Sequence, residues 1–74
     1  MNYEIKNQIK AALEITTAIG GAIRELKSVP AGHLYAQTAS KLTLEQFDGA
    51  VGLLVKSGCV RRDPSGMLTW IGGN

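Results

Sequence analysis

The chain has 74 residues, of which 45% are hydrophobic and 19% are charged, and its formal net charge is +2. A chain of this length makes one domain and buries only about 60% of its unfolded surface, so its core must be small. The composition is that of an ordinary globular domain and excludes the disordered, collagen-like and disulfide-built classes. So small a net charge does not by itself indicate a polyanionic partner, because nucleic-acid binding depends on where the basic groups lie.

The chain has one cysteine, Cys59, and one histidine, His33. A single cysteine cannot form an internal disulfide, and these residues do not offer the spacing of a metal site. Glu4 comes early in the sequence and Glu14 interrupts the longest apolar stretch, so neither a signal peptide nor a membrane span is predicted. We therefore expect a cytoplasmic protein without a cofactor, a bound metal or a membrane contact.

Apolar residues in the first third recur at alternating spacings of four and three, which is the period of an α-helix. The positions are Ile5, Ile9, Ala12, Thr16, Ile19, Ile23 and Leu26, with Thr16 as the one semi-polar member. The pattern predicts an amphipathic helix from about Tyr3 to about Lys27, roughly 35 Å long. Such a helix is longer than a small core needs. Its apolar stripe packs on the domain's own core, or part of the helix overhangs and forms a homodimer through Ile9, Ile19, Ile23 and Leu26.

Gly20 and Gly21 lie inside this helical pattern. Each interior glycine costs roughly 1 kcal/mol relative to alanine, so the pair is expected to weaken, kink or break the helix. With Ala18 and Ala22 beside them, the glycines would also make a smooth patch that another helix could approach closely.

A boundary is predicted at Ser28-Val29-Pro30. Proline disfavours helical angles in the residue before it and is itself favoured at the first position of a new helix. The segment from Pro30 to Ala39 is expected to bury Leu34 with either Tyr35 or Thr38, and residues 40–42 are expected to form the turn that follows.

Thr43 and Gln46 have the spacing of a capping box, which is the strongest local signal in the chain. They open a third helix that is predicted to end at Ser57-Gly58, with Leu44, Phe47, Val51, Leu54 and Val55 on its core face. The opposite face shows Glu45, Asp48, Gly49, Gly52 and Lys56. The two glycines on this face allow either the close approach of a partner or close packing inside the domain.

Arg61 and Arg62 precede the tetrapeptide Asp63-Pro64-Ser65-Gly66, whose proline and glycine suit a type I turn. The turn predicts a hairpin in which Arg62 lies opposite Met67, Arg61 opposite Leu68, Val60 opposite Thr69 and Cys59 opposite Trp70. Because side chains alternate along a strand, the two arginines are expected on opposite faces. Cys59 is expected to be a small core residue.

This order of elements, from roughly Ser28 to Ile71, resembles a winged helix-turn-helix domain of the small prokaryotic or phage type. The resemblance implies an α+β, mostly α fold with three helices and a C-terminal two-stranded β-hairpin, the wing. The single domain of residues 1–74 would then comprise a long N-terminal helix (1–27), a helix-turn-helix (28–58), the wing hairpin (59–71) and a short tail (72–74).

The resemblance also implies that the protein binds double-stranded DNA in the way of transcription regulators with this fold, whose third helix enters the major groove. In this chain Glu45 and Asp48 lie where base contacts are expected, and their charge would repel phosphates. The Gln46 amide could read adenine, but its role in the capping box competes for the same group. We therefore expect mainly phosphate contacts, from the set Lys41, Thr43, Gln46, Lys56, Arg61 and Arg62.

The alternative is a non-catalytic module of the same fold for protein interaction or assembly. It would use Gly49 and Gly52, or the stripe of the first helix. We expect no enzymatic activity, because no partner at local spacing would activate a serine, threonine or cysteine nucleophile.

Overall fold

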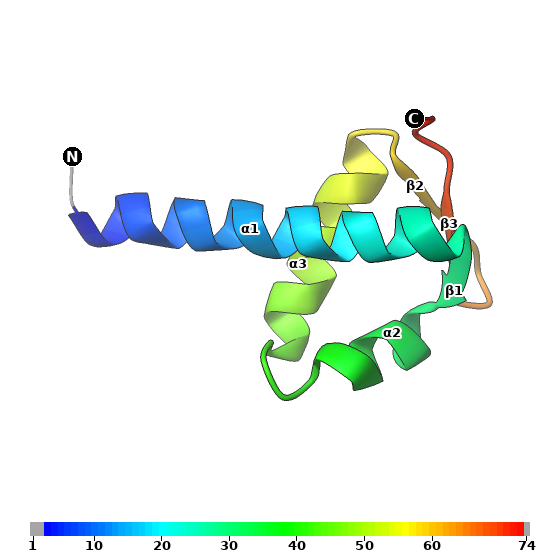
Figure 1. The fold of residues 1–74 in the computed structure, drawn as a ribbon, viewed down its shortest axis with the longest axis horizontal. Helices are drawn as coiled ribbons and strands as arrows, with labels where there is room; N and C mark the ends of the chain where they lie inside the picture. Colours follow the sequence, from blue (N-terminus) through cyan, green and yellow to red (C-terminus); the bar gives the residue numbers. More distant parts are fainter. Residues whose placement is uncertain (1–2, 74) are drawn as a thin grey trace.

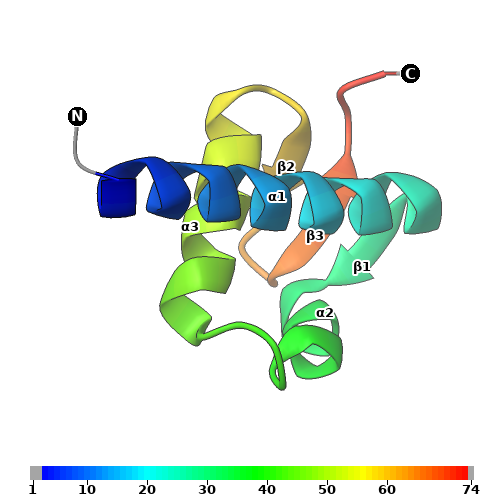
Figure 2. The ribbon, with the colours of Figure 1, turned by 60° about the vertical axis from the view of Figure 1, so that its left-hand side comes forward.

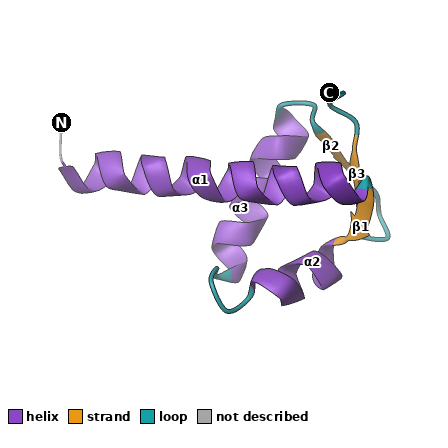
Figure 3. Ribbon diagram, in the orientation of Figure 1, coloured by secondary structure: helices purple, strands orange, loops and turns teal. Residues whose placement is uncertain are grey.

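The computed structural model describes the backbone of residues 3–73 and the side chains of residues 12–73. Within these residues three helices pack against one small sheet (Figures 1 and 3). The elements in chain order are α1 (Tyr3–Leu26), β1 (Ser28–Pro30), α2 (Ala31–Thr38), α3 (Leu44–Lys56), β2 (Val60–Arg62) and β3 (Met67–Trp70). The fold is α+β and mostly helical, as the sequence predicted.

The first helix, α1, crosses α3 and extends past it toward the N-terminus (Figures 1 and 2). It runs through Gly20 and Gly21 as one continuous helix, so the expected break is absent from this part of the chain. A β-carbon at Gly20 would lie 3.0 Å from Cδ2 of Leu54, whereas one at Gly21 would meet nothing within 4 Å. Gly20 therefore lets α3 of the same chain approach closely, and that packing offsets the low helix propensity of the glycine.

The segment after α1 is a third strand of the sheet, which the sequence analysis predicted only as a boundary. Lys27 adopts a left-handed conformation with φ 71°, and its carbonyl accepts a hydrogen bond of 2.8 Å from the Trp70 amide. Strand β1 then pairs antiparallel with β3, and the strand order is β1-β3-β2. The predicted two-stranded hairpin is present as β2 and β3, but the sheet contains β1 as a third strand that was not predicted. Pro30 ends β1 and caps α2 in an extended conformation, which an edge strand tolerates.

The third helix begins and ends where the sequence predicted. The Thr43 hydroxyl accepts a hydrogen bond of 3.1 Å from the Gln46 amide N–H, and Gln46 Oε1 accepts one of 2.9 Å from the Thr43 N–H. This reciprocal pair confirms the capping box. At the other end Ser57 is the C-cap and Gly58 follows with φ 81°, the left-handed conformation that glycine supplies at helix ends.

The core contains the four residues that were predicted to share it, namely Leu34, Phe47, Val51 and Leu54. The full buried apolar set is Ile19, Ile23, Val29, Ala31, Leu34, Phe47, Ala50, Val51, Leu54, Val60 and Leu68. The Tyr35 ring meets the Phe47 ring edge to face, with centroids 5.3 Å apart.

Three large apolar residues predicted on core faces are instead exposed, with Leu26 at 52%, Leu44 at 54% and Val55 at 41% of their full accessibility. Leu26 is the last residue of α1, and the last buried residue of this helix is Ile23. The buried residues of α3 include Ala50. The centre of the buried face therefore lies closer to Ala50 and Leu54 than the centre of the predicted stripe does. Leu44 and Val55 consequently lie at its border.

The hairpin has a register one residue away from the predicted one. Val60 pairs with Trp70, Arg61 with Thr69 and Arg62 with Leu68. The Gly66 N–H donates to the Asp63 carbonyl at 3.0 Å, the Asp63 N–H donates to the Met67 carbonyl at 3.1 Å, and Gly66 has φ 91°. A type I turn followed by a left-handed glycine takes one extra residue into the loop, and this bulge shifts every pair.

Candidate nucleic-acid interface

Four basic side chains that were predicted to contact DNA are exposed, namely Lys41, Lys56, Arg61 and Arg62. Lys41 lies in the turn before α3, where its N–H donates to the Thr38 carbonyl at 2.9 Å. Lys56 is the last residue of α3. Basic groups therefore lie at both ends of α3.

The two arginines of β2 lie on opposite faces of the sheet. Arg62 pairs with Leu68 and shares its face with Val60, and both of those apolar side chains are buried. This is the face on which the helices pack. Arg61 pairs with Thr69, which in turn pairs with Ser28 on β1. Residues directly opposite one another point to the same side, so Arg61, Thr69 and Ser28 share the outer face of the sheet.

The exposed face of α3 carries two acids and two glycines. Glu45, Asp48, Gly49 and Gly52 are all exposed, together with Lys56. A β-carbon at Gly49 or at Gly52 would meet nothing within 4 Å. Packing inside the domain therefore does not require these glycines, and that alternative from the sequence analysis is wrong.

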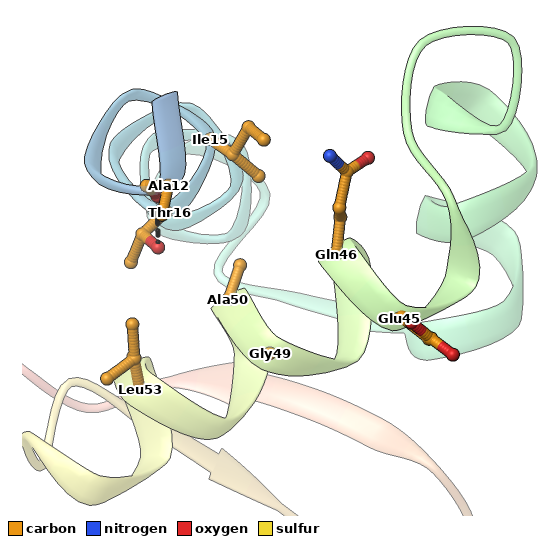
Figure 4. A pocket seen from close by; sticks show the side chains of 8 residues that line it. All are labelled: Ala12, Ile15, Thr16, Glu45, Gln46, Gly49, Ala50 and Leu53. Atoms are coloured by element: carbon orange, nitrogen blue, oxygen red, sulfur yellow. Dashed lines mark hydrogen bonds between the residues drawn. The ribbon is translucent and has the colours of Figure 1, made fainter. Parts of the chain in front are cut away.

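Thr43 and Gln46 are already engaged with each other in the capping box, so the Gln46 carbonyl oxygen is not available to a base. Figure 4 shows the Gln46 side chain on the side of α3 that is turned toward Ile15, whereas Glu45 points away from α1. The Gln46 side chain, which was predicted to contact DNA, therefore lies on the α1 side of α3 and not on the face that carries Glu45.

A pocket of about 330 Å³ lies between α1 and α3. Its lining residues are Ala12, Ile15, Thr16, Glu45, Gln46, Gly49, Ala50 and Leu53 (Figure 4). The Thr16 hydroxyl donates to the Ala12 carbonyl at 2.8 Å, which leaves the pocket walls mainly apolar. Leu53 is 52% exposed at this pocket. Ile15 and Leu53 were not predicted as site residues, because neither belongs to the apolar stripes with helical spacings of four and three.

Two residues predicted for a homodimer interface, Ile19 and Ile23, are not available to a second copy in this fold. Ile19 and Ile23 are 3% and 0% exposed and belong to the domain's own core, so these two assignments are corrected. The physical reason is that α3 and the sheet already cover this part of the α1 stripe. The side chain of Ile9 lies outside the described residues.

The wing turn is fixed by the Asp63 carboxylate. Its Oδ1 accepts hydrogen bonds from the Ser65 hydroxyl at 2.6 Å and from the N–H groups of Ser65 and Met67, both at 3.0 Å. These bonds, led by the one from the Ser65 hydroxyl, lower the pKa of Asp63, and the charge of Arg61 lowers it further. The turn therefore holds an ionised carboxylate beside Arg61.

The remaining chemistry-bearing side chains do not converge. In the part of the chain that the structure describes, no three His, Cys, Asp or Glu residues are grouped to hold a metal ion. His33 Nε2 lies 3.5 Å from Gln37 Nε2 on exposed α2. Cys59 is half-buried and packs against the core. Among residues 3–73, no helix has both the length and the apolar character needed to cross a membrane.

Comparisons of the chain with protein-family models, with curated proteins and with solved structures find no match.

Proposed function

We propose that this protein is a winged-helix domain that binds double-stranded DNA, mainly through phosphate contacts made on the helical side of its sheet. The observation that carries the proposal is the placement of three exposed cations around α3. Lys41 lies just before the helix, Lys56 ends it, and Arg62 lies on the wing face that is turned to the helices.

The spacing of these cations suits a duplex. A helix of 13 residues is roughly 20 Å long, and a major groove is about 12 Å wide. Lys41 and Lys56 would therefore reach phosphates on the two sides of a groove that α3 enters. The winged-helix resemblance assigns this helix to the groove.

Sequence selectivity is expected to be weak. Glu45 and Asp48 occupy the exposed N-terminal half of α3, where their charge repels phosphates and offers only acceptors to the bases. The helix macrodipole accounts for Glu45, because a carboxylate in the first turn of a helix is stabilised by about 0.3 to 1 kcal/mol. Affinity would then come from phosphate neutralisation, which does not depend on sequence.

The proposal is tested by titrating labelled duplexes of unrelated sequence with the full chain and its variants. Changing Lys41 or Lys56 to Ala should weaken binding to every duplex by a similar factor. Changing Glu45 to Gln should strengthen binding, because it removes a repulsive charge without removing the side chain. If Glu45→Gln instead abolishes binding to one preferred duplex, α3 reads bases and the proposed phosphate mode is wrong.

A second candidate function is self-assembly, and the open glycines of α3 favour it. Gly49 and Gly52 weaken the helix without serving any contact inside the chain, and Gly49 and exposed Leu53 line the pocket beside α1. We propose the projecting part of α1 from a second copy as the occupant (Figure 1). By sequence, that part carries Lys6 and Lys10, opposite in charge to Glu45 and Asp48.

A further inference from the structure

A second pocket, of about 300 Å³, lies beside α1, where this helix passes the C-terminal half of α3 and strand β3 (Figures 1 and 2). Its floor is apolar and is formed by two buried residues, Gly20 on α1 and Leu54 on α3. The volume lies at the lower end of the range of about 300 to 1,000 Å³ that is typical of small-molecule sites. The pocket therefore suits a small ligand with one or two rings.

One wall of this pocket is aromatic. Trp70 is half-buried and pairs with buried Val60, so its side chain lies on the helical face of the sheet. Its Cζ3 atom is 3.9 Å from the position that a β-carbon on Gly20 would take. The indole N–H donates to the Gly73 carbonyl at 2.7 Å. The indole therefore offers the pocket an apolar ring surface, against which another ring can pack.

Arg24 supplies the charge at the rim of the same pocket. It is exposed and follows Gly20 and Gly21 by four and three residues on α1, and residues at these spacings lie on the same side of a helix. Among the described residues that line the pocket, Arg24 alone is charged. Its planar guanidinium matches the two oxygens of a carboxylate. One cation beside apolar surface favours an apolar ligand with a single negative charge.

Gly21 is the lining residue that the fold itself does not explain. It is exposed, it lies within α1, and it is not one of the glycines with positive φ. A β-carbon at this position would meet nothing within 4 Å, and alanine would favour the helix. Gly20 differs, because Leu54 packs closely on it. The missing side chain of Gly21 leaves the backbone of α1 open to the close approach of a ligand.

Helix stabilisation is the competing explanation for Arg24, since a cation in the last turn of a helix offsets the negative end of the macrodipole. A lysine would serve that purpose equally well. The macrodipole also does not require open space at Gly21, one turn earlier, or an aromatic wall beside it. These two features together are what a ligand site would need.

We propose that this pocket binds a small aromatic carboxylate, with the carboxylate paired to Arg24 and the ring lying against Gly21, between Leu54 and Trp70. The three cations of the proposed duplex surface do not line this pocket. The site therefore does not depend on the proposed DNA binding.

Binding is measured by NMR on the full chain, through the backbone amides of Gly20 and Gly21 and the indole N–H of Trp70, the single tryptophan. The chain is titrated with benzoate, with benzyl alcohol and with acetate. We expect saturable shifts with benzoate. Benzyl alcohol, which has the ring without the charge, should bind at least about tenfold more weakly, because it loses the charge-assisted hydrogen bonds. Acetate, which has the charge without the ring, should also bind at least about tenfold more weakly, because it buries little apolar surface.

Variants separate ligand binding from helix stabilisation. Arg24→Ala should weaken benzoate binding about tenfold, whereas Arg61→Ala, on the outer face of the sheet, should leave it unchanged. Gly21→Ala should raise the Tm, because alanine favours a helix, and yet weaken benzoate binding about fivefold or more, because the new methyl occupies the pocket. Gly32→Ala is the matched control on α2, since Gly32 is exposed and also has open space at its β-carbon position. It should raise the Tm without changing benzoate binding.

Four outcomes would overturn the proposal. The three resonances do not respond to benzoate, benzyl alcohol or acetate binds as well as benzoate, Arg61→Ala weakens binding as much as Arg24→Ala, or Gly21→Ala raises the Tm and leaves the affinity for benzoate unchanged.

Discussion

Arg61 and Arg62 are consecutive in the chain, yet they lie on opposite faces of the sheet, because Arg61 pairs with Thr69 and Arg62 pairs with Leu68. The bulge at Gly66 sets this register. Arg62 therefore lies on the helical side with Lys56, whereas Arg61 lies with Ser28 on the outer face. Variants of the two arginines can consequently separate the two surfaces, although the residues are adjacent in sequence.

The first prediction concerns the core. Phe47 is 2% exposed and meets Tyr35 edge to face, so Phe47→Ala should lower the free energy of unfolding by about 3 to 5 kcal/mol. A loss of this size is enough to unfold so small a domain. Leu44→Ala is the matched control on the same helix, because Leu44 is 54% exposed, and it should change stability by less than about 1 kcal/mol. Thermal melts that rank these two variants in the opposite order would show that the assigned face of α3 is wrong.

The second prediction compares a packed glycine with an open one. Gly49→Ala should stabilise the protein by roughly 1 kcal/mol, because alanine favours a helix and the new methyl meets nothing within 4 Å. Gly20→Ala should gain clearly less, because its methyl would lie 3.0 Å from Leu54 Cδ2 and that side chain must shift. Denaturant unfolding measures both. Equal gains at the two positions would mean that α1 and α3 are not in close contact at Gly20.

The third prediction tests self-assembly through the pocket beside Gly49. If the projecting part of α1 from a second copy packs on Leu53, Leu53→Lys should give a folded monomer, as should Ile9→Lys on the projecting part itself. Leu26→Lys is the control, because Leu26 has the same 52% exposure as Leu53 but lies at the far end of α1. Sedimentation equilibrium at high concentration provides the measurement. A monomer for the unmodified chain would end this candidate function.

The fourth prediction concerns pH and the wing turn. The pKa of Asp63 lies below its ordinary value of 3.8, so the folded state favours the ionised carboxylate. The resulting stability is present above the unfolded value and is lost as the pH falls through the lower, folded value. Asp63→Asn cannot titrate, so the stability advantage of the natural chain over this variant should shrink below about pH 4. An advantage that stays constant from about pH 6 to about pH 3 would contradict this account.

Local signals in the sequence predicted the helices well. The capping box of Thr43 and Gln46 fixes the start of α3, Gly58 fixes its end, and both confirmed predictions rest on hydrogen bonds between neighbouring residues. The helical spacing likewise placed Ile19 and Ile23 on the apolar face of α1, although it could not show that the domain's own core covers them.

Features that depend on distant partners were not predictable in this way. Strand β1 has only three residues and ends in proline, and it is a strand only because β3 supplies its partners. The hairpin register depended on a single bulge at Gly66, and it decided which arginine faces the helices. The pocket beside Gly21 joins Arg24 with Trp70, and no sequence spacing relates these residues.

The most direct test of the proposed DNA binding is the salt dependence of duplex affinity, measured by fluorescence anisotropy for the full chain, Arg62→Ala and Arg61→Ala. Each phosphate contact adds about −0.9 to the slope of log affinity against log salt, so contacts from Lys41, Lys56 and Arg62 predict a slope of roughly −3 on duplexes of unrelated sequence. Arg62→Ala should flatten this slope by about one unit, whereas Arg61→Ala, on the outer face, should leave it unchanged. The absence of binding at low salt, an affinity that does not change with salt, or an equal effect of the two arginine variants would contradict the proposal.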